Sequence, residues 1–321
     1  MNYTNNANIP LPLAVFLATD TYDGLPNSIS ATTLLKPIRQ IILSQRLDNE
    51  ATFTDVADLV SSRMGSAIHT AIEQAWLNPT NALRALGYSQ KVIDKIKVNP
   101  TNPNPDDINI YMEQRSCKDI AGMTVTGKFD FVAEGQVQDF KSTSVWTYLN
   151  QSNAEKYQLQ GSIYRWLNPQ IIHKDYMTIH YIFTDFNKVE SLRNKDYPPN
   201  RVHSQRIPLL DLDATEHYVR TKIKQITAHK DTPECDLPQC TDADLWRKPT
   251  VYKYYKDPNK LDRSTKNFDN FTDAAAYMAT KYHNNGMIKE VKGQVVACRY
   301  CPALTLCTQK DAYLASGELI L

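Results

Sequence analysis

The sequence lacks the features that mark membrane proteins, secreted proteins and ATP-driven motors. The longest apolar run near the N-terminus, IPLPLAVFLA (9–18), is too short to span a bilayer and contains two prolines. No basic segment precedes that run, so we expect no signal peptide. The chain also contains no G-x4-G-K-[ST] motif, which argues against a P-loop motor. We therefore expect a cytoplasmic protein that has no membrane partner.

Glycine is scarce, with 10 in 321 residues, and no internal repeat or low-complexity tract occurs. The hydrophobic content of 42% and the charged content of 22% are ordinary for a soluble globular protein. The length suits one large domain or two closely packed ones with a sizeable core. Because the net charge is only +1, any surface that binds nucleic acid must be local.

Cysteine is absent before Cys117, and three of the six cysteines crowd near the C-terminus at Cys298, Cys301 and Cys307. Such crowding is more typical of metal ligation in a reducing cytoplasm than of disulfides. The C-x2-C-x5-C spacing suits an iron–sulfur cluster or zinc, and either metal needs one more ligand. The alternative interpretation is a set of buried free thiols.

Periodicity and turn signals predict an order of helices and strands. We expect helices at 28–46, broken or kinked at Pro37, at 54–76 with Thr54 as its cap, and at 154–167, 213–230 and 271–285. Strands are expected at 108–117, 123–132, 137–143 and 175–184. The composition becomes turn-rich, aromatic and basic from about Pro233. This order predicts an N-terminal extension (1–27), a core (28–232) and a C-terminal region (233–321).

The segment GKFDFVAEGQVQDFK (127–141) concentrates charge on two predicted strands joined by a turn at Glu134-Gly135. Asp130 lies on the first strand, and Asp139 and Lys141 share one face of the second, while Phe140 points toward the core. Carboxylates select hard cations such as Mg²⁺ or Mn²⁺. A D-x-K pattern alone is also common in solvated hairpins, so this segment gains weight only from its surroundings.

Two predicted helices carry polar pairs one turn apart. His69 and Glu73 lie at the edge of an apolar helix face, and a neutral imidazole can complete a carboxylate site. An isolated helical histidine is more often structural. Gly65 in the same helix predicts close approach of another backbone. Gln160 and Tyr164 form the second pair.

Together these segments resemble a known family. GSAIHTAIE (65–73), GKFD (127–130), DFK (139–141) and QGSIY (160–164) occur in the order and spacing of the RecB-like branch of the PD-(D/E)XK nucleases. SISATTLLKPIRQIIL (28–43) also looks like the opening of that branch. The resemblance covers roughly residues 28–183 and the C-terminal cysteines. It implies an α/β fold, with a mixed central β-sheet flanked by helices and a cysteine-clustered C-terminal region packed on this core.

The resemblance also implies roles for individual residues. The ligands of Mg²⁺ or Mn²⁺ would be His69, Asp130, Asp139 and the Phe140 carbonyl, and Lys141 would be the catalytic lysine. Gln160 and Tyr164 match a motif that borders the site and contacts DNA or supports the site. Glu73 and Glu113 are further acidic candidates.

The cysteine spacing resembles that of iron–sulfur nucleases such as AddB and the CRISPR-adaptation nucleases, which implies a 4Fe-4S cluster, with zinc as the alternative. In those proteins the first ligand precedes the histidine motif, and here no cysteine does. We predict Cys240, in a turn flanked by proline, as the missing ligand, followed in preference by Cys235 and Cys117. The metal would hold the C-terminal region in place and would have no catalytic role.

The segment WRKPTVYKYYK (246–256) interleaves aromatic and basic residues. This pattern suits stacking on single-stranded bases with phosphate contacts, and equally suits an ordinary tyrosine-rich strand.

The resemblance implies a metal-dependent DNA nuclease of phage or bacterial origin, acting in recombination, repair or degradation. We expect an exonuclease that acts on DNA that is single-stranded or has ends, leaves a 3′-hydroxyl and a 5′-phosphate, and is compatible with a recombination or helicase partner. A CRISPR-adaptation-type nuclease and an endonuclease are the enzymatic alternatives. A catalytically idle DNA-binding module of the same fold is the non-enzymatic one.

Overall fold

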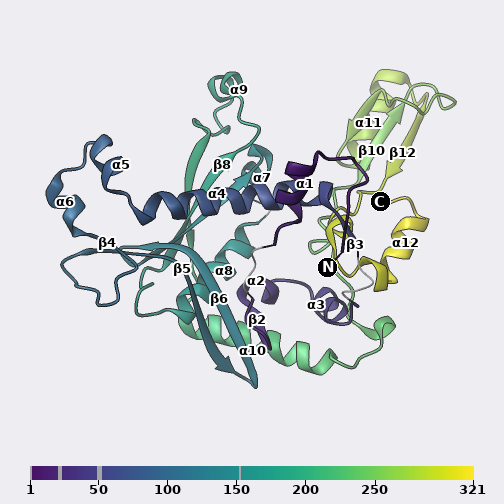
Figure 1. Ribbon diagram of the computed structural model, residues 1–321. Helices are drawn as coiled ribbons and strands as arrows, with labels where there is room; N and C mark the ends of the chain where they lie inside the picture. The colour runs from purple at the N-terminus through teal and green to yellow at the C-terminus, as the bar shows by residue number, and fades with distance from the viewer. Residues whose placement is uncertain (1, 21–23, 49–52, 152) are drawn as a thin grey trace. The chain divides into compact units, whose positions relative to one another are not determined.

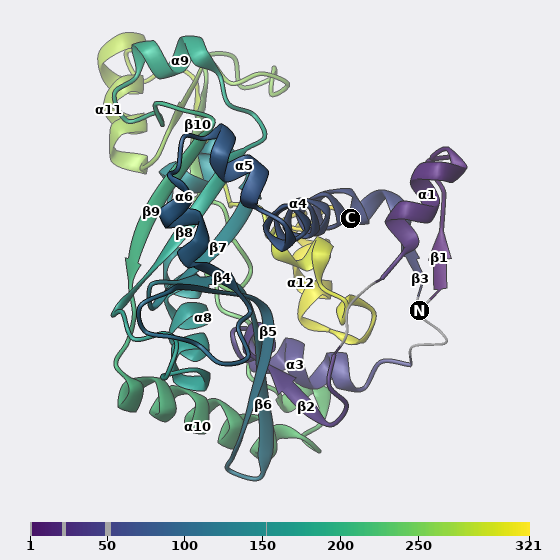
Figure 2. The same ribbon diagram turned by 60° about the vertical axis from the view of Figure 1, so that its left-hand side comes forward.

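The computed structural model describes residues 2–20, 24–48, 53–151 and 153–321. The chain divides into two compact units (Figures 1 and 2). The first unit contains Met1–Leu35 and Asp48–Lys224, and the second contains Lys36–Leu47 and Gln225–Leu321. The short segment 36–47 thus belongs with the C-terminal part of the chain. No helix among the described residues is long and apolar enough to cross a membrane.

The first unit is built on a mixed β-sheet in the order β4-β5-β6-β7-β8-β9, with β2 paired to β6. The pairs β5–β6, β6–β7 and β8–β9 are antiparallel, and β4–β5, β7–β8 and β2–β6 are parallel. Helices flank this sheet, so the predicted fold class is confirmed. The strands are β2 (Ser28–Ser30), β4 (Ile96–Val98), β5 (Ile108–Ile120), β6 (Met123–Ala133), β7 (Gln136–Thr143), β8 (Tyr176–Phe183) and β9 (Val202–Pro208).

Two tight turns connect β5, β6 and β7, as the sequence predicts. Ala121 and Gly122 have φ of 50° and 79°, and Glu134 and Gly135 have φ of 51° and 75°. Positive φ at both central positions is the geometry that matches the twist of antiparallel strands. Gly135 is also required by space, because a Cβ there would overlap the His173 ring.

Helices α4 (Val60–Leu77) and α8 (Ala154–Leu167) lie on opposite faces of the sheet. The ring of Phe140 on β7 contacts the His69 ring of α4, whereas Lys141 lies over the Tyr157 ring of α8. Neighbouring residues on a strand point to opposite faces, so the segment of β7 around Phe140 is enclosed from both sides.

The other elements of the first unit are shorter or more peripheral. They are β1 (Asn2–Thr4), α1 (Leu11–Ala18), α2 (Ala31–Leu34), β3 (Phe53–Asp55), α5 (Thr80–Ala85), α6 (Gln90–Lys95), α7 (Val145–Leu149), α9 (Lys188–Arg193) and α10 (Leu212–His229), which ends in the second unit. The helices predicted at 154–167 and 213–230 are confirmed.

The second unit contains a small antiparallel sheet in the order β11-β10-β12. Its strands are β10 (Val251–Tyr255), β11 (Lys266–Phe268) and β12 (Met287–Val291). Its helices are α3 (Ile38–Gln45), α11 (Phe271–Tyr282), which packs on the sheet, and α12 (Gln309–Ala315).

Three local predictions need correction. Residues 28–46 do not begin as a helix, because Ser28–Ser30 pair with β6, although the helix does break at Pro37. Thr54 lies in β3 and does not cap a helix: the Asp55 carboxylate caps the short 3-10 helix Val56–Leu59 by accepting from the Ala57 amide at 3.0 Å, and no side chain caps α4 itself. A Cβ at Gly65 would meet nothing within 4 Å, so no backbone approaches this glycine closely.

Candidate functional site

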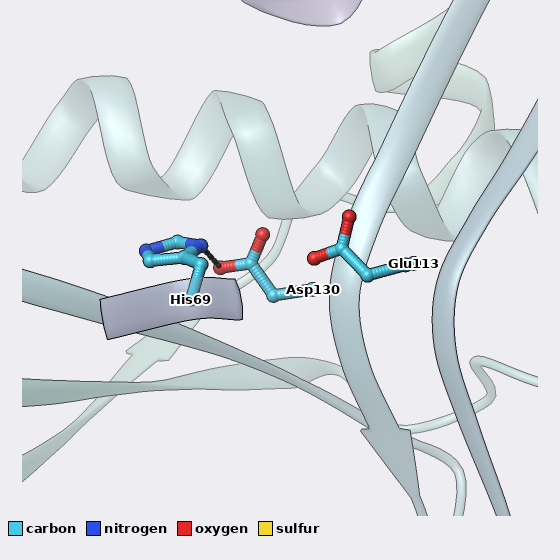
Figure 3. A group of neighbouring side chains, drawn as sticks. All are labelled: His69, Glu113 and Asp130. Atoms are coloured by element: carbon cyan, nitrogen blue, oxygen red, sulfur yellow. Dashed lines mark ion pairs between the residues drawn. The ribbon is translucent and has the colours of Figure 1, made fainter. Parts of the chain in front are cut away.

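His69 and Asp130 form the centre of the site, and Figure 3 shows the Asp130 carboxylate between the His69 ring and Glu113. His69 Nδ1 lies 3.3 Å from Asp130 Oδ2, and His69 Nε2 lies 2.7 Å from the Phe140 carbonyl oxygen. Burial lowers the pKa of His69, but the hydrogen bond and charge of Asp130 outweigh it and raise that pKa above its usual value. Both ring nitrogens therefore face acceptors, which suits an imidazolium when no metal is bound.

Asp130 occupies the point where β6 and β7 separate. The paired residues of these strands run from Ala133↔Gln136 to Phe131↔Gln138, and Asp130 and Asp139 follow directly. Asp130 Oδ2 also accepts a long hydrogen bond of 3.4 Å from the Phe140 amide. The fork between the strands thus brings both carboxylates and the Phe140 backbone to one place.

Asp139 and Lys141 form a buried ion pair on the α8 side of the fork. Asp139 is 1% exposed, and Lys141 Nζ lies 2.5 Å from Asp139 Oδ2. Among the described residues, neither Asp139 oxygen accepts a hydrogen bond of good geometry. Burial, with added repulsion from Asp130, raises the pKa of Asp139 to about 6 against the opposing charge of Lys141. A buried carboxylate that lacks aligned donors is the kind of group that a cation stabilises.

Glu113 adds a third carboxylate from β5. Its ligand atom lies within 4.8 Å of those of His69 and Asp130, and these three form a group that could hold a metal ion. Glu113 has φ of 51° in the middle of a strand, directly beside the residues Met112 and Gln114, which pair with β6. Lys128 holds the Glu113 carboxylate at 2.9 Å. The strand therefore departs from regular geometry where it presents this side chain.

Glu73, the other acidic candidate, lines the same opening. The hollow at this site is lined by His69, Ile72, Glu73, Met112, Glu113, Asp130, Phe131 and Phe140. Glu73 stands at its wall and is not part of the converging group of His69, Glu113 and Asp130. The two acidic candidates thus differ in their distance from the centre.

Gln160 and Tyr164 lie beneath the site on α8. Both are buried, and Gln160 Nε2 donates a hydrogen bond of 3.0 Å to the Tyr164 hydroxyl oxygen. Burial, with the negative charges of Asp139 and Asp130, raises the pKa of Tyr164 well above its usual range, so its phenol stays neutral. Since both side chains are enclosed, they support the site from below, and the buried pair is poorly placed to contact DNA directly.

Four of the six cysteines share one neighbourhood in the second unit. Burial first, then the charge of Asp244 and those of Cys307, Cys301 and Cys298, raise the pKa of Cys240 to about 12. Burial and two of the same thiols raise the pKa of Cys298 to about 11. Hydrogen bonds of 2.9 Å from the Cys240 amide to Gln309 and from Gln309 back to the Cys240 carbonyl fix this loop beside Cys307.

The remaining cysteines do not take part in this group as the structure places them. Cys235 is exposed, and Cys117 is exposed on β5 of the first unit. The thiols at 240, 298, 301 and 307 offer four soft donors at one place, which fits a soft metal centre. Among the described residues, His69, Glu113 and Asp130 are the group whose three ligand atoms lie within 4.8 Å of one another. No three of the described cysteine sulfurs meet that limit.

Arg39 reaches this cysteine group from α3, and nothing in the sequence pattern predicts it. Arg39 is 3% exposed, and its Nε donates to Cys307 Sγ at 3.2 Å. Its other nitrogens donate to the Leu237 carbonyl oxygen at 3.0 Å and to the Glu234 carboxylate. A buried cation is thus held in fixed contact with a cysteine sulfur.

Stacking on bases requires exposed aromatic rings, and two of the tyrosines in 246–256 are not exposed. Tyr254 and Tyr255 are buried, and Tyr254 packs on Tyr277 and Tyr282 of α11. Of the two interpretations of this segment, the tyrosine-rich strand holds for these two residues, because both side chains are buried. Trp246, 48% exposed, remains accessible.

Tyr157 and Lys128 also contact site residues, although no motif singles them out. Tyr157 lies under Lys141, with Nζ 5.7 Å from the ring centroid, and Lys128 pairs with Glu113. A period of three to four residues from Gln160 on α8 does place Tyr157 on the same helix face, and this spacing is the sequence signal that could have found it.

Two solved structures are similar to this chain at low sequence identity. No family model matches the chain, and no curated protein matches its sequence. The crystal structure of SSO0001 is similar with a TM-score of 0.39 and 14% identity, covering 66% of this chain and 83% of that one. A phage-related exonuclease from Haemophilus somnus 129PT has a TM-score of 0.30 and 13% identity, covering 64% and 93%. Neither similarity defines a family for this chain.

Proposed function

We propose that this protein is a divalent-metal-dependent deoxyribonuclease, and specifically an exonuclease of the RecB-like PD-(D/E)XK type. The observation that carries the proposal is the fork between β6 and β7. There the His69 ring contacts both Asp130 and the Phe140 carbonyl, the Phe140 amide donates to Asp130, and the buried Asp139–Lys141 pair adjoins them. A binding module has no need for a buried acid, a buried lysine and a histidine at one strand fork.

The donor set fits a hard cation. Asp130, Asp139, Glu113, His69 and the Phe140 carbonyl offer oxygen atoms and one imidazole nitrogen, which Mg²⁺ or Mn²⁺ accepts. Such an ion, when bound, polarises a phosphoryl oxygen and lowers the pKa of water. The Asp139 oxygens, which accept no hydrogen bond of good geometry among the described residues, support the proposal of a bound cation.

The chain's own residues would divide the remaining work. Lys141 is held beside Asp139 and over Tyr157, so its ammonium orients the attacking water and opposes charge that develops on the phosphorus oxygens. Water adds its oxygen to phosphorus while the bond to the 3′ oxygen breaks and that oxygen takes up a proton. The products are a 5′-phosphate and a 3′-hydroxyl. Gln160 and Tyr164 hold α8 against this arrangement.

For the second unit we infer a structural metal centre at Cys240, Cys298, Cys301 and Cys307. The C-x2-C-x5-C spacing, with Cys240 as the fourth ligand, supports a 4Fe-4S cluster, and zinc is the alternative. The buried Arg39 beside Cys307 would offset part of the negative charge of such a centre.

The test of the nuclease proposal uses end-labelled single-stranded DNA, end-labelled duplex and a closed circular duplex. Each is incubated with the purified protein and Mn²⁺ or Mg²⁺, and a Lys141→Ala variant is run beside it. We expect progressive shortening of linear DNA, no cutting of the circle, and loss of roughly 10²-fold or more in rate for the variant.

Three outcomes separate the alternatives. Cutting of the closed circle would identify an endonuclease. Cleavage that persists unchanged in Lys141→Ala would point to a contaminating enzyme and remove the support for this site. Metal-independent binding of DNA with no cleavage by the wild type under any condition would favour the idle binding module.

A further inference from the structure

The small sheet of the second unit places two lysines directly opposite each other. Lys253 on β10 pairs with Lys289 on β12, and both are in the antiparallel register that brings opposed side chains to the same face. Like charges in such positions destabilise a sheet, because their Cβ atoms lie only about 5 Å apart. Among the described residues, no ion pair or hydrogen bond of either ammonium group offsets this repulsion.

These lysines lie on the face turned away from α11. The neighbouring residues Tyr252 and Tyr254 point the other way, where Tyr252 contacts Phe271 and Tyr254 contacts Tyr277. Alternation then directs Lys253 and Lys289 to the opposite face. Lys253 is half-buried and Lys289 is exposed.

The segment that contains this small sheet is more basic than the rest of the chain. Residues 246–293 contain ten Lys and Arg against five Asp and Glu, whereas the full chain has a net charge of only +1. The rest of the chain is therefore net acidic. Positive charge is gathered on this segment, which indicates a polyanionic partner.

An exposed aromatic pair lies where the backbone pairing of β10 and β12 extends beyond the two strands. The Lys248 amide donates to the Gln294 carbonyl at 3.0 Å, and the Val296 and Ala297 amides donate to the Leu245 carbonyl at 3.0 Å, so pairing continues past Val251↔Val291. Trp246 and Tyr300 follow there, with ring centroids 6.2 Å apart and exposures of 48% and 64%.

We propose that the Lys253/Lys289 face of the small sheet, together with the exposed Trp246–Tyr300 pair, binds single-stranded DNA, with the lysines on its phosphates and the two rings stacked on its bases. Exposed aromatic rings beside basic side chains are the combination that single strands require, since a duplex keeps its bases stacked internally. The proposal rests on the proposed function for its choice of DNA. It adds a substrate-holding surface outside the fork of β6 and β7.

The first test measures binding of a labelled single-stranded oligonucleotide over a range of salt concentrations, without divalent metal so that no cleavage occurs. The variant carries Lys253→Gln and Lys289→Gln. We expect the slope of log affinity against log salt to become shallower by about 1.4, since each phosphate contact on a single strand contributes about 0.7. A Lys188→Gln and Lys195→Gln variant removes the same charge from exposed positions in the other unit and should leave the slope unchanged.

Thermal unfolding of the DNA-free protein gives a second readout. Because Lys253 and Lys289 repel each other, the Lys253→Gln variant should unfold at a temperature no lower than that of the wild type while it binds DNA more weakly. This combination distinguishes a binding role from a structural one.

A Trp246→Ala variant tests the stacking. We expect roughly tenfold or greater loss of affinity for the single strand and little change for a duplex of the same sequence. An unchanged salt slope in the Lys253/Lys289 variant, an equal change in the Lys188/Lys195 control, or an equal loss for duplex with Trp246→Ala would overturn the proposal. Normal binding with no cleavage would sink only the proposed nuclease function.

Discussion

At the scale of single residues, the site is defined by how closely each acidic group approaches His69. The sequence pattern ranks Glu73 and Glu113 equally, because both are carboxylates near motif residues. The structure separates them, since Glu113 converges with His69 and Asp130 within 4.8 Å and Glu73 only lines the hollow. The side chain of Glu113 reaches this position from a strand residue with a positive φ.

This difference predicts unequal effects of the two conservative substitutions. Glu113→Gln removes a negative ligand from the converging group, and we expect the Mn²⁺ concentration for half-maximal cleavage to rise by about 10- to 100-fold. Glu73→Gln should change it by much less. Metal-dependence curves for the two variants provide the measurement, and a larger shift for Glu73→Gln would mean that Glu113 is not a ligand.

The convergence of Asp130, Asp139 and Lys141 was predictable from the sequence alone. Asp130, Asp139 and Lys141 lie close together in sequence on two strands joined by a tight turn, so local pairing brings them together. His69 and Glu113 were harder to rank, because their positions depend on how α4 and β5 meet the fork. Arg39 could not be predicted at all, since its partners Glu234, Leu237 and Cys307 are distant in sequence.

At the scale of elements, α8 is held close to the sheet by glycines on both partners. A Cβ at Gly127 on β6 would lie 2.7 Å from Leu167 Cδ1, and a Cβ at Gly161 on α8 would lie 2.5 Å from Met177 Sδ and 2.8 Å from Leu209 Cδ2. Contacts under 3 Å force neighbouring atoms to move. This close approach is what places Gln160 and Tyr164 beneath Asp139.

Substitution of two helical glycines tests this packing. Gly161→Ala overpacks the interface between α8 and β8, and we expect a loss of about 1–3 kcal/mol in the free energy of unfolding. Gly65→Ala on α4 meets nothing within 4 Å and should gain about 0.5–1 kcal/mol, because alanine favours the helix. Denaturant unfolding of both variants provides the comparison, and equal effects would contradict the packing described for α8.

The element order was largely predictable, and the failures have physical causes. The strands around 108–143 and the helix at 154–167 follow from strong alternation, tight turns and a 3.6-residue period. The strand at Ser28–Ser30 was missed because its pairing partner, β6, supplies the stabilisation and its own three residues carry no strand pattern. The helix predicted at 54–76 has an apolar face, yet none of the residues of α4 is buried.

At the scale of the whole molecule, the two candidate metal centres belong to different compact units. The oxygen-rich group at His69, Glu113 and Asp130 lies in the first unit, and the four cysteines with Arg39 lie in the second. Hard and soft donors are therefore separated along the chain, so different metals should stabilise different units. The composition shift near Pro233 marks the change in sequence, but the inclusion of residues 36–47 in the second unit has no sequence signal.

A matched pair of cysteine variants tests this separation. Cys240→Ser removes a predicted ligand, whereas Cys235→Ser alters an exposed thiol five residues earlier in the same segment. We expect Cys240→Ser to lose bound iron and the absorbance near 400 nm. It should also unfold at a lower temperature, because the free energy of metal binding contributes to the stability of the folded state. Cys235→Ser should keep both. Iron analysis, absorbance and thermal unfolding are measured on the same preparations.

Added Mn²⁺ then distinguishes the two centres within one protein. An ion that binds only the folded first unit stabilises it by about 2.7 kcal/mol when present at one hundred times its dissociation constant. This stabilisation should persist in Cys240→Ser, since His69, Asp130 and Asp139 are untouched, and should disappear in Asp130→Asn, which keeps its iron. Loss of the Mn²⁺ effect in Cys240→Ser would show that the two centres depend on each other. Retention of iron in Cys240→Ser together with its loss in Cys235→Ser would instead assign the fourth ligand to Cys235.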